Sequence, residues 1–362
     1  MSTTYDAAAS AAPSLLLPAI AELYDLEGYS FTQIQPHGGR NLVYTCHKEG
    51  APERIIRIAF LDDRSREDFE SELEYVRYLY EHGGRVSNVI DSRHGRLLEE
   101  LRQGEHTYFI SLFERAPGKL LADNHYRYRD GAPLAEYFYN CGQTLGKLHQ
   151  LSKNYTPTTR RYDFFDKYNR TTIERIVPVS LPVVKEKLLQ LVETLQGLSQ
   201  HEDHYGMVHF DYSDGNYHID FEDGTLTVFD FDNACYCWYM YDLATLWVHG
   251  VGWVQFEPDG NKRRAFMDDY FAAVLDGYRS ETELEDTMLE LLPLFTRVTL
   301  MEFILERLKE ASVEMHHNEA AAEDDEELMY LVRCVENDLP YHGFFHELYS
   351  CEAPFQFQAR QD

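Results

Sequence analysis

Short segments that alternate apolar and polar residues occupy the first third of the chain, and this alternation predicts β-strands with one buried face. The expected strands are residues 31–35, 41–46 and 54–60, followed after Leu97 by a pair whose inner strand is residues 107–113. Between the third strand and this pair, apolar residues recur every three or four positions, as on the buried face of a helix. These residues are Phe69, Leu73, Val76 and Tyr80. We therefore expect a small antiparallel sheet with one main helix.

Helical spacing of apolar residues characterises the rest of the chain. Helices are expected at residues 136–149, 183–199, 262–278, 282–292 and 294–311. The segment from Glu114 to Gly118 separates the two parts and contains the Pro and Gly typical of a linker. This organisation predicts an α+β protein with two lobes. Its expected divisions are an N-terminal helical extension (1–30), a small sheet lobe (31–113), an interlobe linker (114–118) and a larger, mostly helical lobe (119–362).

The strongest chemical signal lies in two acidic segments joined by a predicted hairpin. Asn216 follows Asp211 by five positions, and Asp230 follows Asp211 by 19 positions. The intervening residues alternate on both sides of Glu222-Asp223-Gly224, which is typical of a tight hairpin turn. The hairpin is expected to return Asp230 to a position beside Asn216.

This spacing suits phosphoryl transfer from a nucleotide. The reaction needs a carboxylate that orients and deprotonates the acceptor hydroxyl, and oxygen ligands that hold Mg²⁺ against the phosphates. Protein kinases use an Asp, an Asn five positions later and an Asp on the next loop. Asp211 is accordingly predicted as the catalytic base, and Asn216 and Asp230 as metal ligands. Asp232 has two alternative roles, a water-mediated contact with a second metal or an anchor for the loop.

The segment from His209 to Ala244 resembles the aminoglycoside phosphotransferase and choline kinase family. The family loop reads His-Gly-Asp, four residues and Asn, followed by an Asp-Phe-Asp stretch and later by Asp-Leu-Ala. Here Phe210 replaces the usual Gly, and Asp242-Leu243-Ala244 stands at the last position. The resemblance implies a two-lobed protein-kinase-like fold and the activity of a small-molecule kinase. It also implies that Asp242 anchors the catalytic loop, whereas His209 is expected to buttress that loop by hydrogen bonding.

Arg57 is predicted to bind the nucleotide phosphates. It lies in an apolar strand, Ile55-Ile-Arg-Ile-Ala, where an unpaired charge would be costly. Glu72, at the edge of the apolar face of the next helix, is the natural partner. In kinases a cation on this strand binds the α- and β-phosphates and is held by a Glu of this helix. The alternative is a purely structural ion pair.

Two backbone elements complete the predicted nucleotide site. Taken alone, Gly38 and Gly39 favour an ordinary hairpin turn. The resemblance favours a phosphate-binding turn, because family members carry Gly-Gly and then an Asn, here Asn41, before the second strand. It further implies that backbone groups of the linker, at Glu114 and Ala116, bind the nucleotide base.

The overall charge narrows the class of partner. The 362-residue chain has a formal net charge of −29, which disfavours a nucleic-acid backbone or an anionic membrane and favours a cationic acceptor. The alternative is that this acidity serves only solubility. Six scattered cysteines, and an N-terminal stretch that lacks the pattern of a signal peptide or a membrane span, predict a cytoplasmic protein with reduced thiols.

The expected activity is therefore that of a kinase that requires Mg²⁺ and ATP or GTP and acts on a hydroxyl of a small molecule, such as an amino alcohol, amino acid, sugar or aminoglycoside. Acidic residues of the C-terminal helices are candidates for binding an amine of the acceptor, with a solvated helix face as the alternative: Asp268, Asp269, Glu302 and Glu306. Trp238, Tyr239 and Tyr241 are candidates for aromatic contacts with a cation, with core packing as the alternative. Two other activities remain. One is a catalytically inactive, nucleotide-binding relative. The other is a metal-dependent phosphohydrolase that uses His201 and His204.

Overall fold

The computed structural model describes residues 8–9, 12–34, 40–60, 64–104, 106–254, 256–315 and 325–339, with the backbone alone at 312–315. These residues form two compact units, each built from separate stretches of sequence. Unit 1 comprises Met1–Asp130, Asn154–Arg161 and Asp214–Asp232. Unit 2 comprises Gly131–Lys153, Tyr162–Ser213 and Asn233–Asp362. The predicted turn at Gly38 and Gly39 lies outside the described residues.

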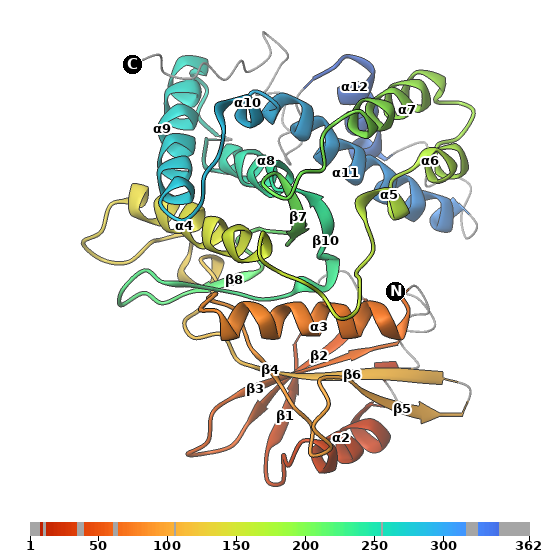
Figure 1. The fold of residues 1–362 in the computed structure, drawn as a ribbon, viewed down its shortest axis with the longest axis vertical. Coiled ribbons are helices and arrows are strands. Elements are labelled where there is room, and N and C mark those ends of the chain that lie inside the picture. Colours follow the sequence, from red (N-terminus) through yellow and green to blue (C-terminus); the bar gives the residue numbers. More distant parts are fainter. Residues whose placement is uncertain are drawn as a thin grey trace. The chain divides into compact units, whose positions relative to one another are not determined.

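Unit 1 is built on a six-stranded antiparallel sheet (Figure 1). Five strands follow the order β1-β2-β3-β6-β4, and β5 pairs with β6. The strands are β1 (Ser30–Gln33), β2 (Asn41–His47), β3 (Arg54–Ala59), β4 (Val89–Ile90), β5 (Glu99–Gln103) and β6 (His106–Glu114). The strands predicted from alternation are therefore present. The last of them, β6, also includes Glu114, which the sequence analysis placed in the linker.

The two faces of this sheet have separate hydrophobic cores because successive side chains of a strand point to opposite faces. Ile56 and Ile58 of β3 belong to one core, with the π-helical turn η1 (Ala12–Leu16) and helix α2 (Leu17–Leu23). Ala59 belongs to the other core, with Phe69 and Leu73 of helix α3 (Arg66–Glu81). Arg57 points to the face covered by α3, which places it opposite that helix.

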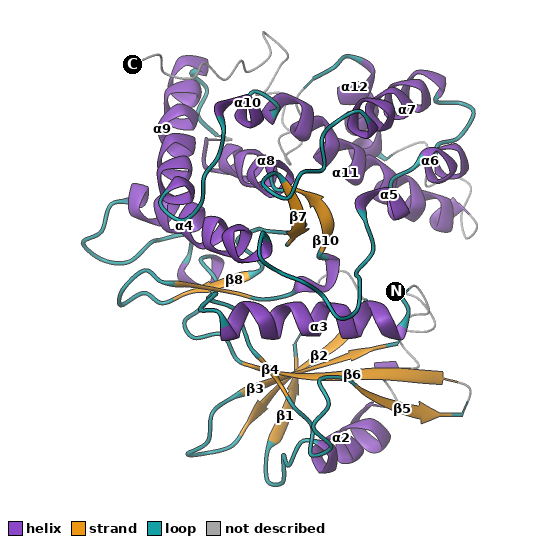
Figure 2. Cartoon of the chain, viewed as in Figure 1, coloured by secondary structure: helices purple, strands orange, loops and turns teal. Residues whose placement is uncertain are grey.

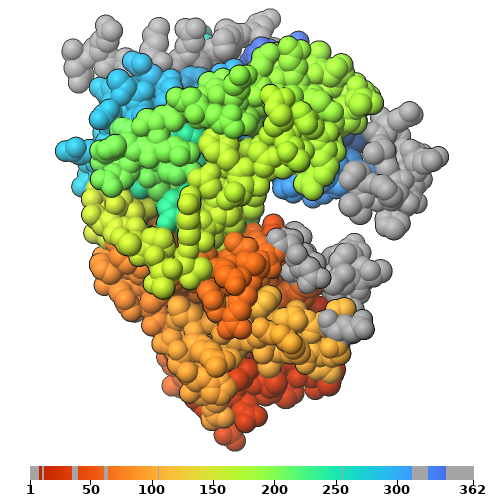
Figure 3. Space-filling view, turned by 45° about the vertical axis from the view of Figure 1, so that its right-hand side comes forward, coloured from red at the N-terminus to blue at the C-terminus, as the bar shows by residue number. Residues whose placement is uncertain are grey.

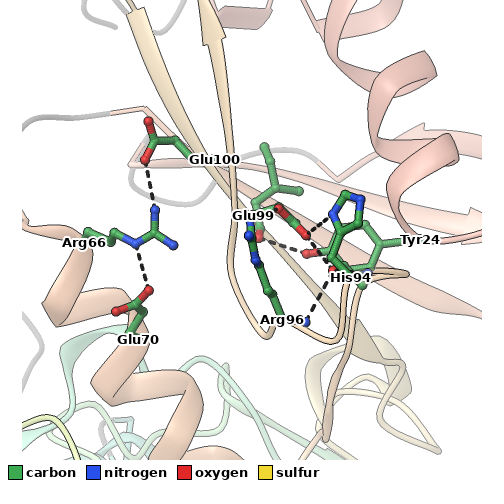
Figure 4. A network of polar contacts seen from close by, with 9 residues as sticks. Tyr24, Arg66, Glu70, His94, Arg96, Glu99 and Glu100 are labelled. Atoms are coloured by element: carbon green, nitrogen blue, oxygen red, sulfur yellow. Dashed lines mark hydrogen bonds and ion pairs between the residues drawn. The ribbon is translucent and has the colours of Figure 1, made fainter.

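Polar contacts fix the start of α3. Ser65 and Asp68 form a capping box, in which each side chain accepts a hydrogen bond from the other residue's backbone amide. Arg66 contacts Glu70 at 2.8 Å and Glu100 of β5 at 3.1 Å (Figure 4). In the same view Glu99 accepts a hydrogen bond from His94. It accepts another from Ser92, and although burial raises the pKa of Glu99, these bonds outweigh burial and lower it. The start of α3 is thus joined to the β5 edge.

A short hairpin belongs to unit 1 although it follows much of the helical sequence. Strands β8 (Tyr217–Ile219) and β9 (Leu226–Val228) pair antiparallel, and the 3-10 turn η3 (Phe231–Asn233) follows. The amide of Ser87 donates to the carbonyl of Val228 at 2.8 Å, and the amide of Val228 donates to that of Arg85 at 2.9 Å. These bonds attach the hairpin to the loop before β4. The predicted hairpin is confirmed.

Unit 2 is mainly helical (Figure 2). Its longer helices are α4 (Leu134–Ser152), α6 (Arg170–Ile176), α7 (Pro182–Gln196), α8 (Met240–Gly250), α9 (Gly260–Arg279), α11 (Leu292–Met315) and α12 (Glu326–Glu336). Shorter helical elements are α5 (Phe164–Lys167), η4 (Val251–Val254) and α10 (Asp286–Leu289), and strands β7 (Tyr205–Val208) and β10 (Cys235–Trp238) pair antiparallel. No helix in the described ranges is long and apolar enough to cross a membrane.

The helix predicted at 282–292 is wrong in its first part. Only Asp286–Leu289 is α-helical before α11 begins at Leu292. Lys153 at the end of α4 donates to the Thr282 hydroxyl and to the Glu283 carbonyl, at 2.9 and 3.3 Å. These tertiary bonds hold residues 282–283 as a connection, which local helical spacing does not reveal.

Glycines allow α4 and α9 to pack with their backbones close together. A Cβ atom on Gly142 of α4 would lie 1.8 Å from the carbonyl oxygen of Val274. A Cβ on Gly277 of α9 would lie 2.0 Å from the carbonyl oxygen of Tyr139. Contacts of this length do not occur, so the helices would have to separate around any larger residue. This pair of helices supports the loop described below.

We expect Gly142→Ala to destabilise the protein by about 1–3 kcal/mol, because the added methyl group overpacks this helix pair. Gly260→Ala, at the start of α9, is the matched control because its Cβ would meet only Arg263 Nη2, at 3.6 Å. Urea denaturation of both variants checks the prediction. Equal midpoints for the two variants would contradict it.

Candidate active site

Arg57 of β3 and Glu72 of α3 form a buried, bidentate ion pair in unit 1. Arg57 Nη1 lies 2.7 Å from Glu72 Oε1, and Nη2 lies 3.0 Å from Oε2. Burial alone lowers the pKa of Arg57, but Glu72 outweighs it and raises the pKa above its usual range, with smaller contributions from Asp232 and Asp230. The predicted pairing is confirmed. The guanidinium is thereby fixed, and the charge of Asp230 acts on it.

Asp232 is held by a set of cationic and amide groups. Its Oδ2 lies 3.1 Å from Arg64 Nη1 and accepts a hydrogen bond from the Asn41 side chain at 3.3 Å. Burial raises the pKa of Asp232, but Arg64 and Arg57 outweigh burial and lower it to about 2. The carboxylate therefore stays ionised. Of the two alternative roles of Asp232, these contacts favour the loop anchor.

The hairpin brings the two predicted metal ligands to the same end of unit 1. The amide of Phe229 donates to the carbonyl of Asn216 at 2.9 Å, next to Asp230. Asp230 has a φ of 63°, in the left-handed region that Asp tolerates better than most residues. It is exposed, while Asn216 is half-buried. The return of the chain to Asn216, predicted from alternation, is confirmed.

The linker is attached to the same hairpin. His218 of β8 has its Nδ1 2.9 Å from the carbonyl oxygen of Ala116, and Lys119 and Ile219 exchange two backbone hydrogen bonds. A Cβ on Gly118 would lie 2.0 Å from the carbonyl oxygen of Ile219, so only glycine permits this approach. Glu114 donates its amide to the Asn88 carbonyl at 2.8 Å. The backbone at Glu114 and Ala116 is therefore fixed, and its contact with a base remains a prediction.

In unit 2, the carboxylate of Asp242 fastens the loop that carries Asp211. Asp242, in the first turn of α8 and fully buried, accepts the backbone amides of His209 and Phe210, each at 2.9 Å. His149 Nε2 lies 3.1 Å from the same carboxylate, and its Nδ1 lies 2.9 Å from the Tyr278 hydroxyl. Burial lowers the pKa of His149, although Asp242 opposes this. The predicted anchoring of this loop by Asp242 is confirmed, and His149 is packed against the same carboxylate.

Phe210 adopts a backbone conformation suited to the glycine it replaces. Its φ is 68°, in the left-handed region that bulky residues rarely occupy. Two contacts compensate for this strain. The Asp242 carboxylate fixes its amide, and its ring stacks on Tyr241 at a centroid distance of 4.1 Å and an angle of 4°. The ring thus holds the turn immediately before Asp211, which also donates its amide to His209 Nδ1 at 3.3 Å.

Glu302 of α11 lies in the neighbourhood of Asp211. The hydroxyl of Tyr241 donates a hydrogen bond to Glu302 Oε2. Burial of the carboxyl group raises the pKa of Glu302 to about 8, the Tyr241 hydroxyl opposes this, and the charge of Asp211 adds to it. Tyr241, Trp238 and Tyr239 are buried, as core packing requires. Glu306 is exposed, in agreement with the alternative of a solvated helix face.

Glu302 makes stability depend on pH. Its folded pKa of about 8 lies above its ordinary value of 4.5, so its stabilising contribution is complete below pH 4.5 and is lost as pH rises through about 8. Glu302→Gln keeps an oxygen for the Tyr241 hydroxyl but has no charge. We expect equal melting temperatures for the two proteins at pH 4, below the unfolded pKa, and a higher one for the variant at pH 9, above the folded pKa. Parallel melting curves across this range would exclude a raised pKa.

Two residues that bind Asp232 were not predicted from the sequence. Arg64 contacts its carboxylate, as does Asn41 of the predicted Gly-Gly-Arg-Asn motif, and Arg161 donates to its backbone carbonyl. Arg64 lies in the charged run Asp62-Asp63-Arg64-Ser65-Arg66, which is typical of a solvated turn.

His201, a candidate residue of the alternative phosphohydrolase, lies on an exposed loop, and its Nδ1 is 3.1 Å from the Asp203 carboxylate. In the described parts of the chain, no three or more His, Cys, Asp and Glu side chains are grouped to hold a metal.

The antiparallel sheet with its buried Arg–Glu pair and the helical unit with its anchored, Asp-containing loop are features of the protein-kinase-like fold. Residues 31–284 match the phosphotransferase enzyme family. The chain belongs to this family.

Individual relatives agree with the family match. The chain is 28% identical over 330 residues to an amicoumacin kinase of Bacillus subtilis (strain 168), covering 90% of this chain and 93% of that protein. The structure of the amicoumacin kinase hAmiN in complex with AMP-PNP, Ca²⁺ and Ami is similar, with a TM-score of 0.75, 24% identity, and coverage of 94% of this chain and 98% of that one. A microcompartment-associated aminopropanol kinase gives a TM-score of 0.66, with 22% identity and coverage of 88% and 95%. These structural similarities support the predicted fold class.

Proposed function

We propose that the protein transfers the γ-phosphoryl group of ATP or GTP to a hydroxyl group of a small, amine-bearing molecule. The observation that carries this proposal is in unit 1. There, Asp230 acts electrostatically on the buried Arg57–Glu72 pair and lies at the end of the chain segment that returns to Asn216. A fixed cation for phosphates thus accompanies two oxygen donors for a metal. Membership of the phosphotransferase enzyme family supports this assignment.

In this proposal Arg57 binds the α- and β-phosphates. Its guanidinium is held in one orientation by both oxygens of Glu72 and by the Phe113 ring, 5.2 Å away. Binding therefore requires little reorganisation of the side chain. Backbone groups at Glu114 and Ala116 bind the nucleotide base.

Asn216 and Asp230 fit Mg²⁺ because an amide oxygen and a carboxylate oxygen are hard donors of the kind this ion prefers. When bound, the ion neutralises charge on the β- and γ-phosphates. Asp230 is exposed and next to the backbone of Asn216 through Phe229. Asp232, whose carboxylate is engaged by Arg64 and Asn41, anchors the loop instead.

Asp211 orients the acceptor hydroxyl and takes its proton as the phosphoryl group is transferred. The loop before it is fixed by Asp242, so the carboxylate is directed without rearrangement of the backbone. A protonated Glu302 at neutral pH adds no second negative charge beside Asp211.

An amine-bearing acceptor is favoured by two observations. The chain has a formal net charge of −29, which attracts cations over a distance. The relatives include an amicoumacin kinase at 28% identity and, by structure, an aminopropanol kinase. Amicoumacin and amino alcohols are therefore the first acceptors to test, ahead of sugars and neutral amino acids.

The test is a screen for nucleotide consumption, corrected for phosphate release, with amicoumacin, aminopropanol, choline, homoserine and aminoglycosides as acceptors. We expect turnover with one acceptor class, and a loss of about 10²–10⁴-fold in kcat for Asp211→Asn. Mass spectrometry should show one added phosphate on the acceptor. Unchanged turnover in Asp211→Asn would overturn the mechanism.

His204→Ala is the matched control for the phosphohydrolase alternative. His204 lies on the loop before β7 and takes no part in the proposed transfer. We expect kcat and KM within about twofold of the parent values, as for a surface change away from the site. A large loss of activity, accompanied by release of inorganic phosphate without an acceptor, would favour a hydrolase.

A further inference from the structure

Helix α3 is fastened by a segment that belongs, in sequence, between helices α4 and α5. We call this segment, Asn154–Arg161, the α3 strap. It is part of unit 1 and crosses α3 (Figure 1). The space-filling view shows it at the surface, in yellow-green beside the orange residues of α3 (Figure 3). Contacts of the strap can therefore affect the position of α3.

The middle of the strap contacts the outer side of α3. The amides of Thr158 and Thr159 donate to the two carboxylate oxygens of Glu74, at 2.7 and 3.1 Å. The ring of Tyr155 lies 4.9 Å from that of Tyr75 and 4.8 Å from that of Tyr78. These contacts hold the strap on the helix, and the ring of Tyr75 also lies 6.0 Å from that of Phe231, next to Asp230.

The end of the strap makes a different connection. The Arg161 side chain is only 2% exposed. Its Nη1 donates to the carbonyl of Asp68, in the first turn of α3, and its Nη2 donates to the carbonyl of Asp232 in η3. One planar guanidinium thus joins the helix that carries Glu72 to the loop that carries Asp230.

This connection is stiff for physical reasons. A guanidinium offers several donors in a fixed plane, so two bonds to different carbonyls also fix the distance between them. Bonds from a charged donor are stronger than neutral ones, and those of Arg161 are shielded from water. Arg64 reinforces the same loop through the Asp232 carboxylate, so side chain and backbone of Asp232 are both held.

We propose that Arg161 is a positioning residue that sets Asp230 relative to the Arg57–Glu72 pair, so that metal and phosphates are bound together. The proposal rests on the proposed nucleotide function of these residues. Arg161 acts through its bonds to the carbonyl groups of Asp68 and Asp232. Its effect is to couple them, and its loss separates nucleotide binding from metal binding.

The experiment compares ATP affinity with and without Mg²⁺, by calorimetry, for the full chain and for Arg161→Gln. The gain in affinity that Mg²⁺ gives should fall by about 10–100-fold in the variant, the usual effect of removing a residue that orients a metal ligand. Binding of ATP without Mg²⁺ should change little. In the nucleotide-free protein, hydrogen exchange should increase both in the first turn of α3 and at residues 230–233.

Glu74→Ala is the matched control, because it removes the bonds to Thr158 and Thr159 and leaves Arg161 in place. We expect a lower melting temperature for it and an unchanged gain from Mg²⁺. Arg161→Lys keeps the charge but lacks the planar guanidinium, so its Mg²⁺-dependent gain in ATP affinity should lie between those of the parent protein and Arg161→Gln. If Arg161→Gln does not fold, Arg161→Lys provides the same test.

The outcomes separate this inference from the proposed function. If the parent protein shows no Mg²⁺-dependent binding of ATP or of GTP, the proposed function fails. If the parent protein shows it and the Arg161 variants keep the full gain, the positioning role is overturned. The positioning role would also be overturned if Glu74→Ala lost as much of the Mg²⁺-dependent gain in ATP affinity as Arg161→Gln. The effect would then belong to the strap as a whole.

Discussion

A carboxylate removed from water is tolerated only where cations and hydrogen-bond donors surround it, and Asp232 meets this condition. Arg64 and Asn41 hold its carboxylate, and Arg161 holds its carbonyl. Because these three come from distant parts of the sequence, their bonds to a single residue join the sheet, helix α3 and the hairpin. The position of Asp230, two residues earlier, depends on this arrangement. So does the environment of Arg57, whose pKa responds to both aspartates.

In unit 2, one buried carboxylate and two stacked aromatic rings hold the loop before Asp211. Asp242 accepts the amides of His209 and Phe210, and the Phe210 ring stacks on Tyr241. Glycine would reach the left-handed conformation at position 210 without strain, whereas here aromatic packing stabilises it. The hydroxyl of Tyr241 extends the same arrangement to Glu302. Residues that hold the backbone of this loop are therefore continuous with residues that set the electrostatics near Asp211.

The sequence predicted those parts of the site that have a local pattern. The hairpin from Asn216 to Asp230 follows from alternation around a Glu-Asp-Gly turn, and the Arg57–Glu72 pair follows from a charge inside an apolar strand. Arg161 and Arg64 had no such signal, because each stands among charged or polar residues that resemble a solvated turn. The proximity of Glu302 to Asp211 depends on tertiary packing between distant residues, which no spacing encodes. The helix predicted from residue 282 is likewise absent at Thr282, because the tertiary hydrogen bond from Lys153 holds this residue in a connection.

The discontinuity of unit 1 has a consequence for how the protein is made. Its sheet lies within the first stretch, which ends at Asp130, but the hairpin arrives only with Asp214–Asp232. A ribosome therefore releases the whole sheet long before the strand that seals the loop at Arg85 and Ser87 exists. Until then the backbone groups of Arg85 and Ser87 lack these hairpin partners, and unpaired backbone groups in a nascent chain are a known route to misassembly. Cutting the gene at the linker would also remove these partners, so the small lobe alone would lack part of its hydrogen bonding.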